Sequence, residues 1–215
     1  TGNAGQGFDG GVGGNYDATA TDITYTNGKF NQAASFNGSS SYITLPNSVE
    51  VYKGTGKFAI SAWFKTDTIP GTEQMLYCTF ETAYLFIKLK ASGVIEGQVA
   101  EASTGTGRVC ETPTSTISAG IWYHVVFTGD TNDLRLYIDG TLSDSESTWN
   151  GTFYTSNAGC SIGSRNVGTN LFWDGEIEQV RIYGGPLTTS EVQDIYNNSK
   201  PGSLPPLKTS ADLTT

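Results

Sequence analysis

The chain has 215 residues, including 27 Gly, a length that fits one β-sandwich domain. Lys and Arg number 12 against 21 Asp and Glu, so the formal net charge is −9 at pH 7, and charged residues make up only 15% of the chain. This acidic balance, with no basic cluster, argues against nucleic acid and anionic membrane surfaces as partners, and no apolar run is long enough to cross a membrane.

The first clear strand pattern covers residues 58–65. Phe58, Ile60, Ala62 and Phe64 fall on one face because side chains alternate along a strand. We expect this face to lie in the core and the opposite face to be partly exposed to solvent.

Short strand patterns then recur along the chain, separated by Gly, Asn and Asp clusters, which is typical of a sandwich or barrel. They cover residues 74–80, 84–90, 93–100, 121–128, 134–139, 159–164 and 175–183. A Gly-containing turn at 91–93 predicts one hairpin, and a turn at 129–133 predicts another. Typical strand and loop lengths predict about 12 to 14 short strands in total.

One helix is predicted, over residues 187–196. Thr188 and Glu191 have the spacing of a capping box. The apolar stripe of the helix consists of Val192, Ile195 and Tyr196. The residues that follow are rich in Pro, Ser and Thr, so we divide the chain into a domain at 1–198 and a tail or linker at 199–215.

The cysteines leave the redox state open. Cys78, Cys110 and Cys160 are the three cysteines, and His124 is the only histidine. No Cys-x-x-Cys pair is present, which argues against a zinc site. The odd number allows one disulfide with a free thiol, or three buried thiols.

Several segments, in chain order, resemble the laminin G-like and concanavalin A-like family. They are 28–46, 58–65, 122–127 with 134–140, 161–163 and 173–183, and the short helix near Glu191 matches the usual ending. The resemblance covers about residues 8–198. It implies an all-β fold, an antiparallel β-sandwich jelly roll with one short C-terminal helix and one concave sheet. Many members are non-catalytic modules that bind sugars or protein surfaces, often with calcium, while others are hydrolases or lyases.

Calcium is the cofactor that the resemblance implies. In relatives the ion ties the N-terminal segment to the last strand, and the matching positions here are Asp9, Gly38 in the turn after Phe36, and Glu178. Calcium prefers six to eight oxygen ligands, several of them carbonyl and carboxylate oxygens. The alternative is that Asp9 lies in a solvated Gly-rich turn and Glu178 faces water.

Catalytic residues are not predicted. Sugar-cleaving relatives carry Glu-x-Asp-x-x-Glu on a mid-chain strand, and the nearest equivalent here is Glu176-Ile177-Glu178, with Arg181 where the final Glu is expected. Glycosidases need two carboxyl groups on either side of the scissile bond. His124 lies within an apolar strand, which favours a packing role over that of a general base.

We expect ligand contacts in loops at one end of the sandwich or on the concave sheet, and the candidate residues lie in loops. The segment 147–154 offers Trp149, Asn150 and Tyr154, and Arg165 and Asn166 follow. Sugar sites combine an aromatic ring with amide, carboxylate and guanidinium groups, because a pyranose has both C–H faces and hydroxyls. Three further tryptophans are expected in the core, namely Trp63, Trp122 and Trp173.

We therefore predict a non-catalytic recognition module on an extracellular, cell or virion surface. Its partner would be a glycan or a surface protein, and copies arrayed in a larger assembly would gain avidity. One alternative is a structural decoration or adhesion domain with protein partners, because similar modules decorate phage and virus particles. A second alternative is an enzyme that cleaves polysaccharides.

Overall fold

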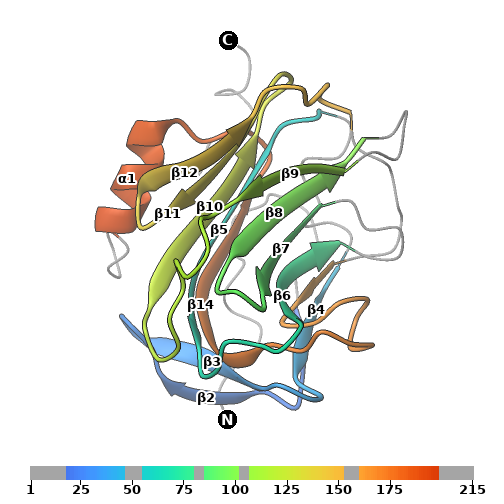
Figure 1. Ribbon diagram of the computed structural model, residues 1–215. Helices are drawn as coiled ribbons and strands as arrows, with labels where there is room; N and C mark the ends of the chain where they lie inside the picture. The colour runs from blue at the N-terminus through green and yellow to red at the C-terminus, as the bar shows by residue number, and fades with distance from the viewer. Residues whose placement is uncertain (1–17, 47–54, 80–84, 102–106, 153–159, 199–215) are drawn as a thin grey trace.

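The computed structural model describes residues 18–46, 55–79, 85–101, 107–152 and 160–198. In these residues it has 14 strands and one helix, which confirms the predicted all-β jelly roll with a short C-terminal helix. The strands form two antiparallel sheets of seven strands each, stacked face to face (Figure 1). The tail at 199–215 lies outside the described residues.

The first sheet, sheet A, holds seven strands. In spatial order these are β1 (Thr19–Thr21), β4 (Tyr42–Leu45), β13 (Cys160–Ile162), β6 (Glu73–Thr79), β7 (Leu85–Lys90), β8 (Ile95–Ala100) and β9 (Gly107–Glu111). The predicted hairpin of β7 and β8 is present, with Leu89 opposite Ile95. The edge strands β1 and β9 were not predicted, because neither has a clear alternation of apolar and polar residues.

The second sheet, sheet B, also holds seven strands. In spatial order these are β12 (Thr141–Glu146), β11 (Leu134–Ile138), β10 (Tyr123–Gly129), β5 (Phe58–Thr66), β14 (Asp174–Tyr183), β3 (Gln32–Asn37) and β2 (Thr24–Asn27). The last described strand, β14, therefore lies between β5 and β3, so strands from distant parts of the sequence pair within this sheet.

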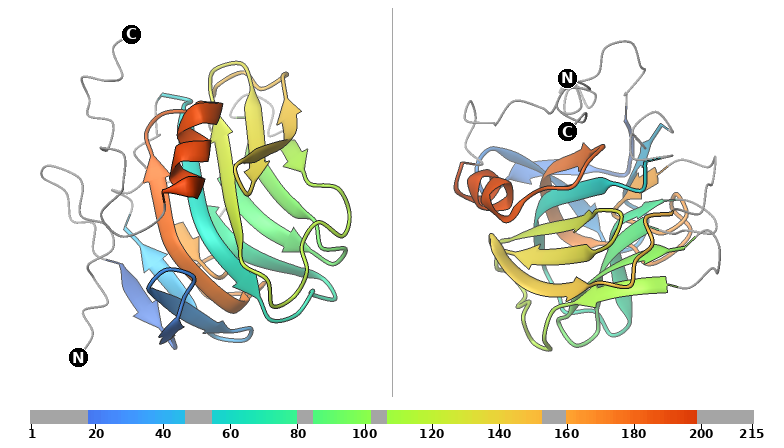
Figure 2. Two further views of the ribbon diagram at one scale, coloured as in Figure 1. Left: turned by 90° about the vertical axis from the view of Figure 1, so that its left-hand side faces the viewer. Right: turned by 90° about the horizontal axis from the view of Figure 1, so that it is seen from above.

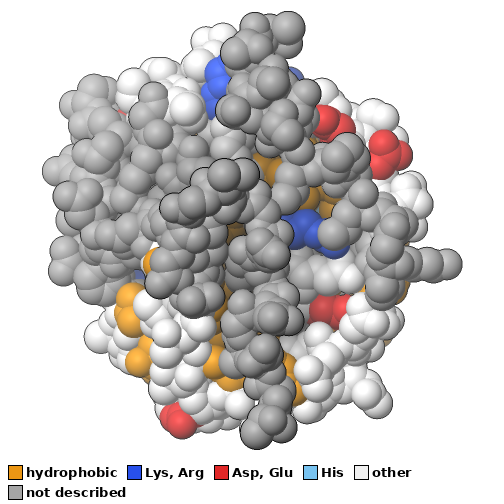
Figure 3. Space-filling view, turned by 180° about the vertical axis from the view of Figure 1, so that it is seen from behind, with side chains coloured by type: hydrophobic (Ala, Val, Ile, Leu, Met, Phe, Trp, Pro, Cys, Tyr) orange, Lys and Arg blue, Asp and Glu red, His pale blue; other side chains and the backbone are white. Residues whose placement is uncertain are grey.

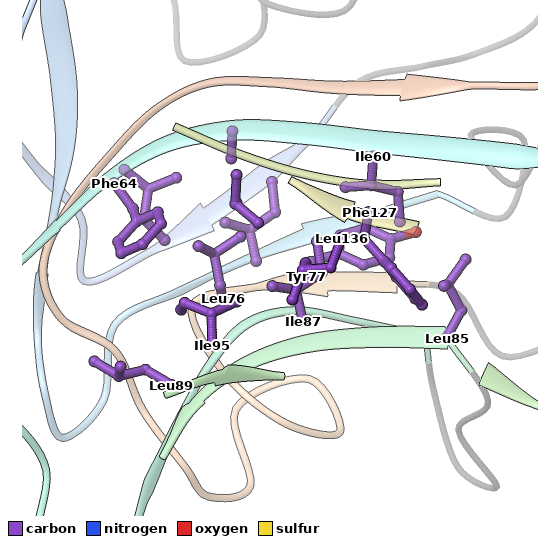
Figure 4. Packing of buried hydrophobic residues seen from close by; sticks show 14 of the residues in the cluster. Ile60, Phe64, Leu76, Tyr77, Leu85, Ile87, Leu89, Ile95, Phe127 and Leu136 are labelled. Atoms are coloured by element: carbon purple, nitrogen blue, oxygen red, sulfur yellow. The ribbon is translucent and has the colours of Figure 1, made fainter. Parts of the chain in front are cut away.

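Apolar side chains from both sheets meet between the layers. In Figure 4 the labelled residues of sheet B, Ile60, Phe64, Phe127 and Leu136, face those of sheet A, Leu76, Tyr77, Leu85, Ile87, Leu89 and Ile95. The layers approach closely at Gly97, where a Cβ atom would lie 2.7 Å from the ring of Phe127. The predicted core face of residues 58–65 is confirmed, and all three cysteines are buried thiols.

The helix α1 (Thr189–Asn197) covers part of the outer face of sheet B (Figure 2). The predicted capping box is present, because Thr188 accepts a hydrogen bond from the Glu191 backbone and the Glu191 carboxylate accepts one from Thr188. Buried residues of the interface are Ala59, Val126, Tyr137, Leu187, Val192 and Ile195. The outer face of residues 58–65 is partly exposed only at Lys65, since Ser61 and Trp63 are buried.

The described surface is polar and sparsely charged. Seen from behind, the Lys and Arg side chains of the described residues form no continuous patch (Figure 3). No helix of the described residues is long and apolar enough to span a bilayer.

Candidate ligand-binding face

The outer face of sheet B is closed by a loop at residues 28–31, which Glu178 of β14 holds in place. One carboxylate oxygen, Oε2, accepts hydrogen bonds from the backbone N–H of Lys29 at 2.7 Å and of Phe30 at 3.3 Å. The other, Oε1, accepts from Asn31 at 3.1 Å. Gly28 is required beside it, because a Cβ there would collide with the Glu178 carboxylate. Glu178 is only 5% exposed, so these bonds are sheltered from water.

Beneath this loop lies a packed aromatic cluster. Phe30 meets the Trp63 ring edge to face at 5.2 Å, and Tyr196 of α1 stacks on the same ring at 5.5 Å. The Lys29 ammonium lies 4.5 Å from a Trp63 ring centroid. Trp63 is therefore buried as predicted, but on the outer face of sheet B and not between the sheets.

His124 belongs to the same cluster. Its ring lies 5.1 Å from that of Trp63, and the side chain is fully buried. Neither ring nitrogen has a hydrogen-bond partner in the described part of the chain. Burial, helped by the nearby charge of Arg181, lowers the His124 pKa to about 3. The residue thus packs as a neutral ring, in agreement with the packing role predicted for it.

The calcium site that the resemblance implied stays a prediction, because one of its three residues is not placed. Asp9 lies outside the described residues. Gly38 sits in a turn with φ of 71°, where its N–H donates to the Trp173 carbonyl, and both oxygens of Glu178 face N–H donors. Within the described ranges no group of three or more His, Cys, Asp or Glu could hold a metal ion. Glu178 ties the N-terminal hairpin to β14 directly, which is the clamping role that the ion was expected to have.

The carboxylates do not form a glycosidase pair. Glu176 makes an ion pair of 3.0 Å with Lys65, while Glu178 is committed to the 28–31 loop. A mid-chain equivalent that the sequence analysis missed is Glu96-Gly-Gln-Val-Ala-Glu101 at β8. Glu96 pairs with lysines on the outer face, whereas Glu101 pairs at 2.8 Å with Arg108, which lies opposite core residue Val99. The two carboxylates therefore point to opposite sides of the strand.

The predicted aromatic loop contact is corrected at Trp149. Its side chain is 2% exposed and belongs to the core, so it offers no surface for a sugar. Asn150 is exposed, and its Oδ1 accepts hydrogen bonds from Thr152. Tyr154 lies outside the described residues. Trp122 is half-exposed instead of buried, with the Lys65 ammonium 5.9 Å from its ring, whereas Trp173 is buried as expected.

Arg165 and Asn166 lie on the outer face of sheet A, in a loop that leads from β13 to β14. The loop is closed by hydrogen bonds between Arg165 and Asn170, at 2.9 Å, and between Gly168 and Ser164, at 2.9 Å. Asn166 has a positive φ of 50°, a left-handed conformation that Asn tolerates. These hydrogen bonds fix the backbone of the loop at Arg165 and Asn166.

This loop lies next to β6, since the Met75 N–H donates to the Leu171 carbonyl at 2.8 Å. Burial raises the pKa of the Cys78 thiol to about 11. The backbone of Asn166 and the charge of Arg165 lie close to this thiol and oppose the rise. Oδ1 of Asn166 is buried and has no hydrogen-bond partner among the described residues. Asn150, in contrast, precedes Gly151, which lies against Gly56 and Thr131. The structure therefore separates Asn150 from Arg165 and Asn166.

Beside Cys78, the outer face of sheet A continues with Phe86, Lys88 and Gln98. Phe86 is the cross-strand partner of Cys78, and Gln98 is the partner of Phe86 on the other side. Directly opposed side chains lie close enough to contact one another. All three are half-buried, and the Lys88 ammonium lies 5.2 Å from the Phe86 ring centroid. The guanidinium of Arg165, the amide of Asn166, the ring of Phe86 and the amide of Gln98 thus follow one another across neighbouring elements. We call these four residues the sugar row.

A ladder of charges borders this row on three strands and the adjoining edge strand. Lys88 bridges Glu73 at 2.8 Å and Glu96 at 3.1 Å, and Lys90 bridges Glu96 at 3.1 Å and Glu111 at 2.8 Å. Burial raises the pKa of Glu96, whereas the hydrogen bond from Lys90 lowers the pKa of Glu111. We call these five residues the charge ladder.

The sequence contained a signal for this face. Residues 85–90 alternate strictly, because Leu85, Ile87 and Leu89 point into the core and Phe86, Lys88 and Lys90 point outward. An outward-facing Phe followed by two outward-facing Lys residues is therefore visible in the pattern. Phe86 was not among the predicted contact residues, because those came from loops.

Comparisons with known proteins agree with this architecture. A family model described as the concanavalin A-like lectin/glucanases superfamily matches residues 37–193. Domain 4 of AbnA, a GH43 extracellular arabinanase from Geobacillus stearothermophilus solved in complex with arabinotriose, is 25% identical with a TM-score of 0.66. That match covers 85% of this chain and 90% of the arabinanase domain.

Two toxin domains are similar in fold. The binding domain of botulinum neurotoxin serotype G is 21% identical with a TM-score of 0.68, over 86% of this chain and 47% of its own. The binding domain of Paraclostridial mosquitocidal protein 1 is 22% identical with a TM-score of 0.72, over 87% of this chain and 48% of its own. The chain thus spans about half of each toxin domain. A search of curated proteins gives no match.

Proposed function

The chain belongs to the concanavalin A-like lectin/glucanases superfamily, and on that premise we propose that it is a non-catalytic module that binds carbohydrate on the outer face of sheet A. The observation that carries the proposal is the row of Arg165, Asn166, Phe86 and Gln98 across neighbouring elements. A sugar ring stacks its C–H face on an aromatic side chain and exchanges hydrogen bonds with amides and guanidinium groups.

One observation supports binding without catalysis, and another supports a sugar as the ligand. The buried carboxylates of Glu96 and Glu178, on the outer faces, and of Glu101, on the opposite side of β8 from Glu96, each already have a cation or backbone donors. A glycosidase instead needs two carboxyl groups that face the same bond, one of them free to exchange a proton. The similar arabinanase domain was solved with a bound trisaccharide, which favours a sugar as the ligand.

We also infer display outside the cell, on a cell or virion surface. The similar domain of AbnA is part of an extracellular enzyme, and the toxin domains are binding domains. A weak site for one sugar fits such a role, because several copies held together gain avidity by about 10² to 10⁴.

The test is a glycan array followed by titration of the strongest binder, with the variants Phe86→Ala and Gln98→Ala. Loss of the stacking surface should weaken binding by about two- to twelvefold, since an aromatic stacking contact contributes roughly 0.5–1.5 kcal/mol. Asn150→Ala is the matched control, because Asn150 precedes Gly151, which lies against Gly56 and Thr131 and not against Phe86 or Gln98, and this variant should bind like the parent. Loss of binding in the Asn150 variant alone would move the site to the loop after β12.

A further inference from the structure

The charge ladder lies on the same face as the proposed sugar row and contains three carboxylates and two ammonium groups. Each ammonium already contacts two carboxylates, within 2.8 to 3.1 Å. The two ends of the ladder, Glu73 and Glu111, are also its most exposed members, with side chains 34% and 41% exposed. A molecule that approaches this face therefore meets carboxylate oxygens first.

This arrangement discriminates between ligands by charge. A carboxylate or sulfate group on a ligand would meet Glu73 or Glu111 and find the cations of Lys88 and Lys90 already neutralised, and juxtaposed like charges lower affinity strongly. A neutral hydroxyl has no such penalty. It can donate to a carboxylate oxygen, and its own oxygen can accept from an ammonium group. The chain as a whole, at a formal charge of −9, adds repulsion of the same sign.

We propose that the charge ladder makes the outer face of sheet A selective for neutral oligosaccharides over those that carry uronate, sialate or sulfate groups. This inference rests on the proposed function. Arg165 is the one described cation of the row outside the ladder, and it serves a neutral sugar as a hydrogen-bond donor. The ladder also ties β6 to β9 together, so its two end carboxylates act on specificity while Glu96 in its centre keeps it assembled.

The experiment uses the full chain and an array that holds neutral polysaccharides beside carboxylated and sulfated ones. The parent protein should bind neutral glycans at least about tenfold more tightly than acidic ones at low salt. The double variant Glu73→Gln/Glu111→Gln leaves one carboxylate against two ammonium groups. It should gain at least about tenfold in affinity for acidic glycans, and that gain should fade as salt rises. Its affinity for neutral glycans should change far less.

The matched control is Glu176→Gln/Asp130→Asn, which removes the same number of negative charges away from this face. Glu176 lies on the outer face of sheet B and Asp130 in the turn before β11. A gain for acidic glycans in both double variants would assign the effect to net charge and overturn the ladder. Binding of acidic glycans by the parent as tightly as neutral ones would also overturn it. Binding of no glycan of either kind would refute the proposed function itself.

Discussion

The outer faces of the two sheets differ in what covers them. On sheet B, the 28–31 loop and α1 lie over β5 and β10, so that Trp63 and His124 are excluded from water and Glu178 is held by backbone donors. On sheet A, Phe86, Lys88 and Gln98 stay half-buried, with the Arg165–Asn166 loop beside them. The same alternation of side chains thus yields a second core on one sheet and an accessible row of polar and aromatic groups on the other.

The difference shows how a face becomes available to a ligand. On both outer faces a large aromatic residue lies near a lysine and a glutamate, so composition does not separate them. The two faces differ because segments of the chain itself, the 28–31 loop and α1, cover the outer face of sheet B. Substitutions at matched positions on the two faces should therefore affect stability on sheet B and binding on sheet A.

The largest expected effect is on the aromatic residues. Trp63→Ala should lower the free energy of unfolding by about 4 kcal/mol, because it leaves a cavity beneath the loop and the helix. This corresponds to a melting temperature roughly 8–16 °C lower for a chain of this size. Phe86→Ala should cost about 1 kcal/mol, since its ring is half-buried. Denaturant unfolding measures both, and equal losses would mean that sheet A is covered as fully as sheet B.

The next effect is on the carboxylates of β14. Glu178→Ala removes the acceptor of three backbone N–H groups and should cost about 3 kcal/mol, because buried donors lose a charged partner. Glu176→Ala, on the same face of the same strand, removes one ion pair with Lys65 and should cost about 1 kcal/mol. Thermal unfolding of the two variants compares them directly. A Glu178 variant no less stable than the Glu176 variant would show that the loop is held by other contacts.

A smaller effect is the pH dependence of stability that His124 causes on the outer face of sheet B. The His124 pKa lies near 3 in the folded chain and near 6.5 when unfolded. Between these values the unfolded state binds the extra proton, so stability falls as the pH is lowered. From pH 6 to pH 4 this should amount to about 2 to 3 kcal/mol. His124→Phe keeps a ring beside Trp63 and removes the titration, so its stability should fall less over this range. Parallel curves for the two proteins would contradict a buried neutral histidine.

The calcium expectation can be measured in the same way. Because Glu178 already faces N–H donors, we expect the melting temperature to be the same with calcium and with a chelator. An ion bound at 100 times its dissociation constant would instead add about 2.7 kcal/mol. A rise of several degrees with calcium would return an ion-binding role to Asp9 and Gly38.

Sequence patterns were sufficient where the structure depends on neighbours in the chain. The alternation at 58–65 and the capping box at Thr188 each involve residues close in sequence, and both are present. The role of Glu178 was not predictable in this way, because the N–H groups that hold it lie 147 to 149 residues away. The same applies to Trp149, which looks exposed in a polar segment until the segment folds back onto the core.

Some residues of the candidate site could be predicted from the sequence and others could not, for the same reason. Arg165 and Asn166 were predicted because they follow the aromatic segment 147–154, and in the structure Arg165 is exposed and Asn166 half-buried. Phe86 and Gln98 were not predicted as partners, because only the pairing of β7 with β6 and β8 brings them beside that loop. A binding row that crosses several strands contains residues from distant parts of the chain, and no single window of sequence holds them together.

The position of β14 has a consequence for biogenesis. This strand is the last of the described strands in chain order, yet it fills the gap between β5 and β3, with Asp174 opposite Asn37 and Gly175 opposite Thr66. Sheet B cannot be completed on the ribosome until residues 174–183 have emerged, and contacts so distant in sequence slow folding. Shortened chains that stop before residue 174 should therefore fail to acquire a cooperative native state, instead of forming a stable half-domain.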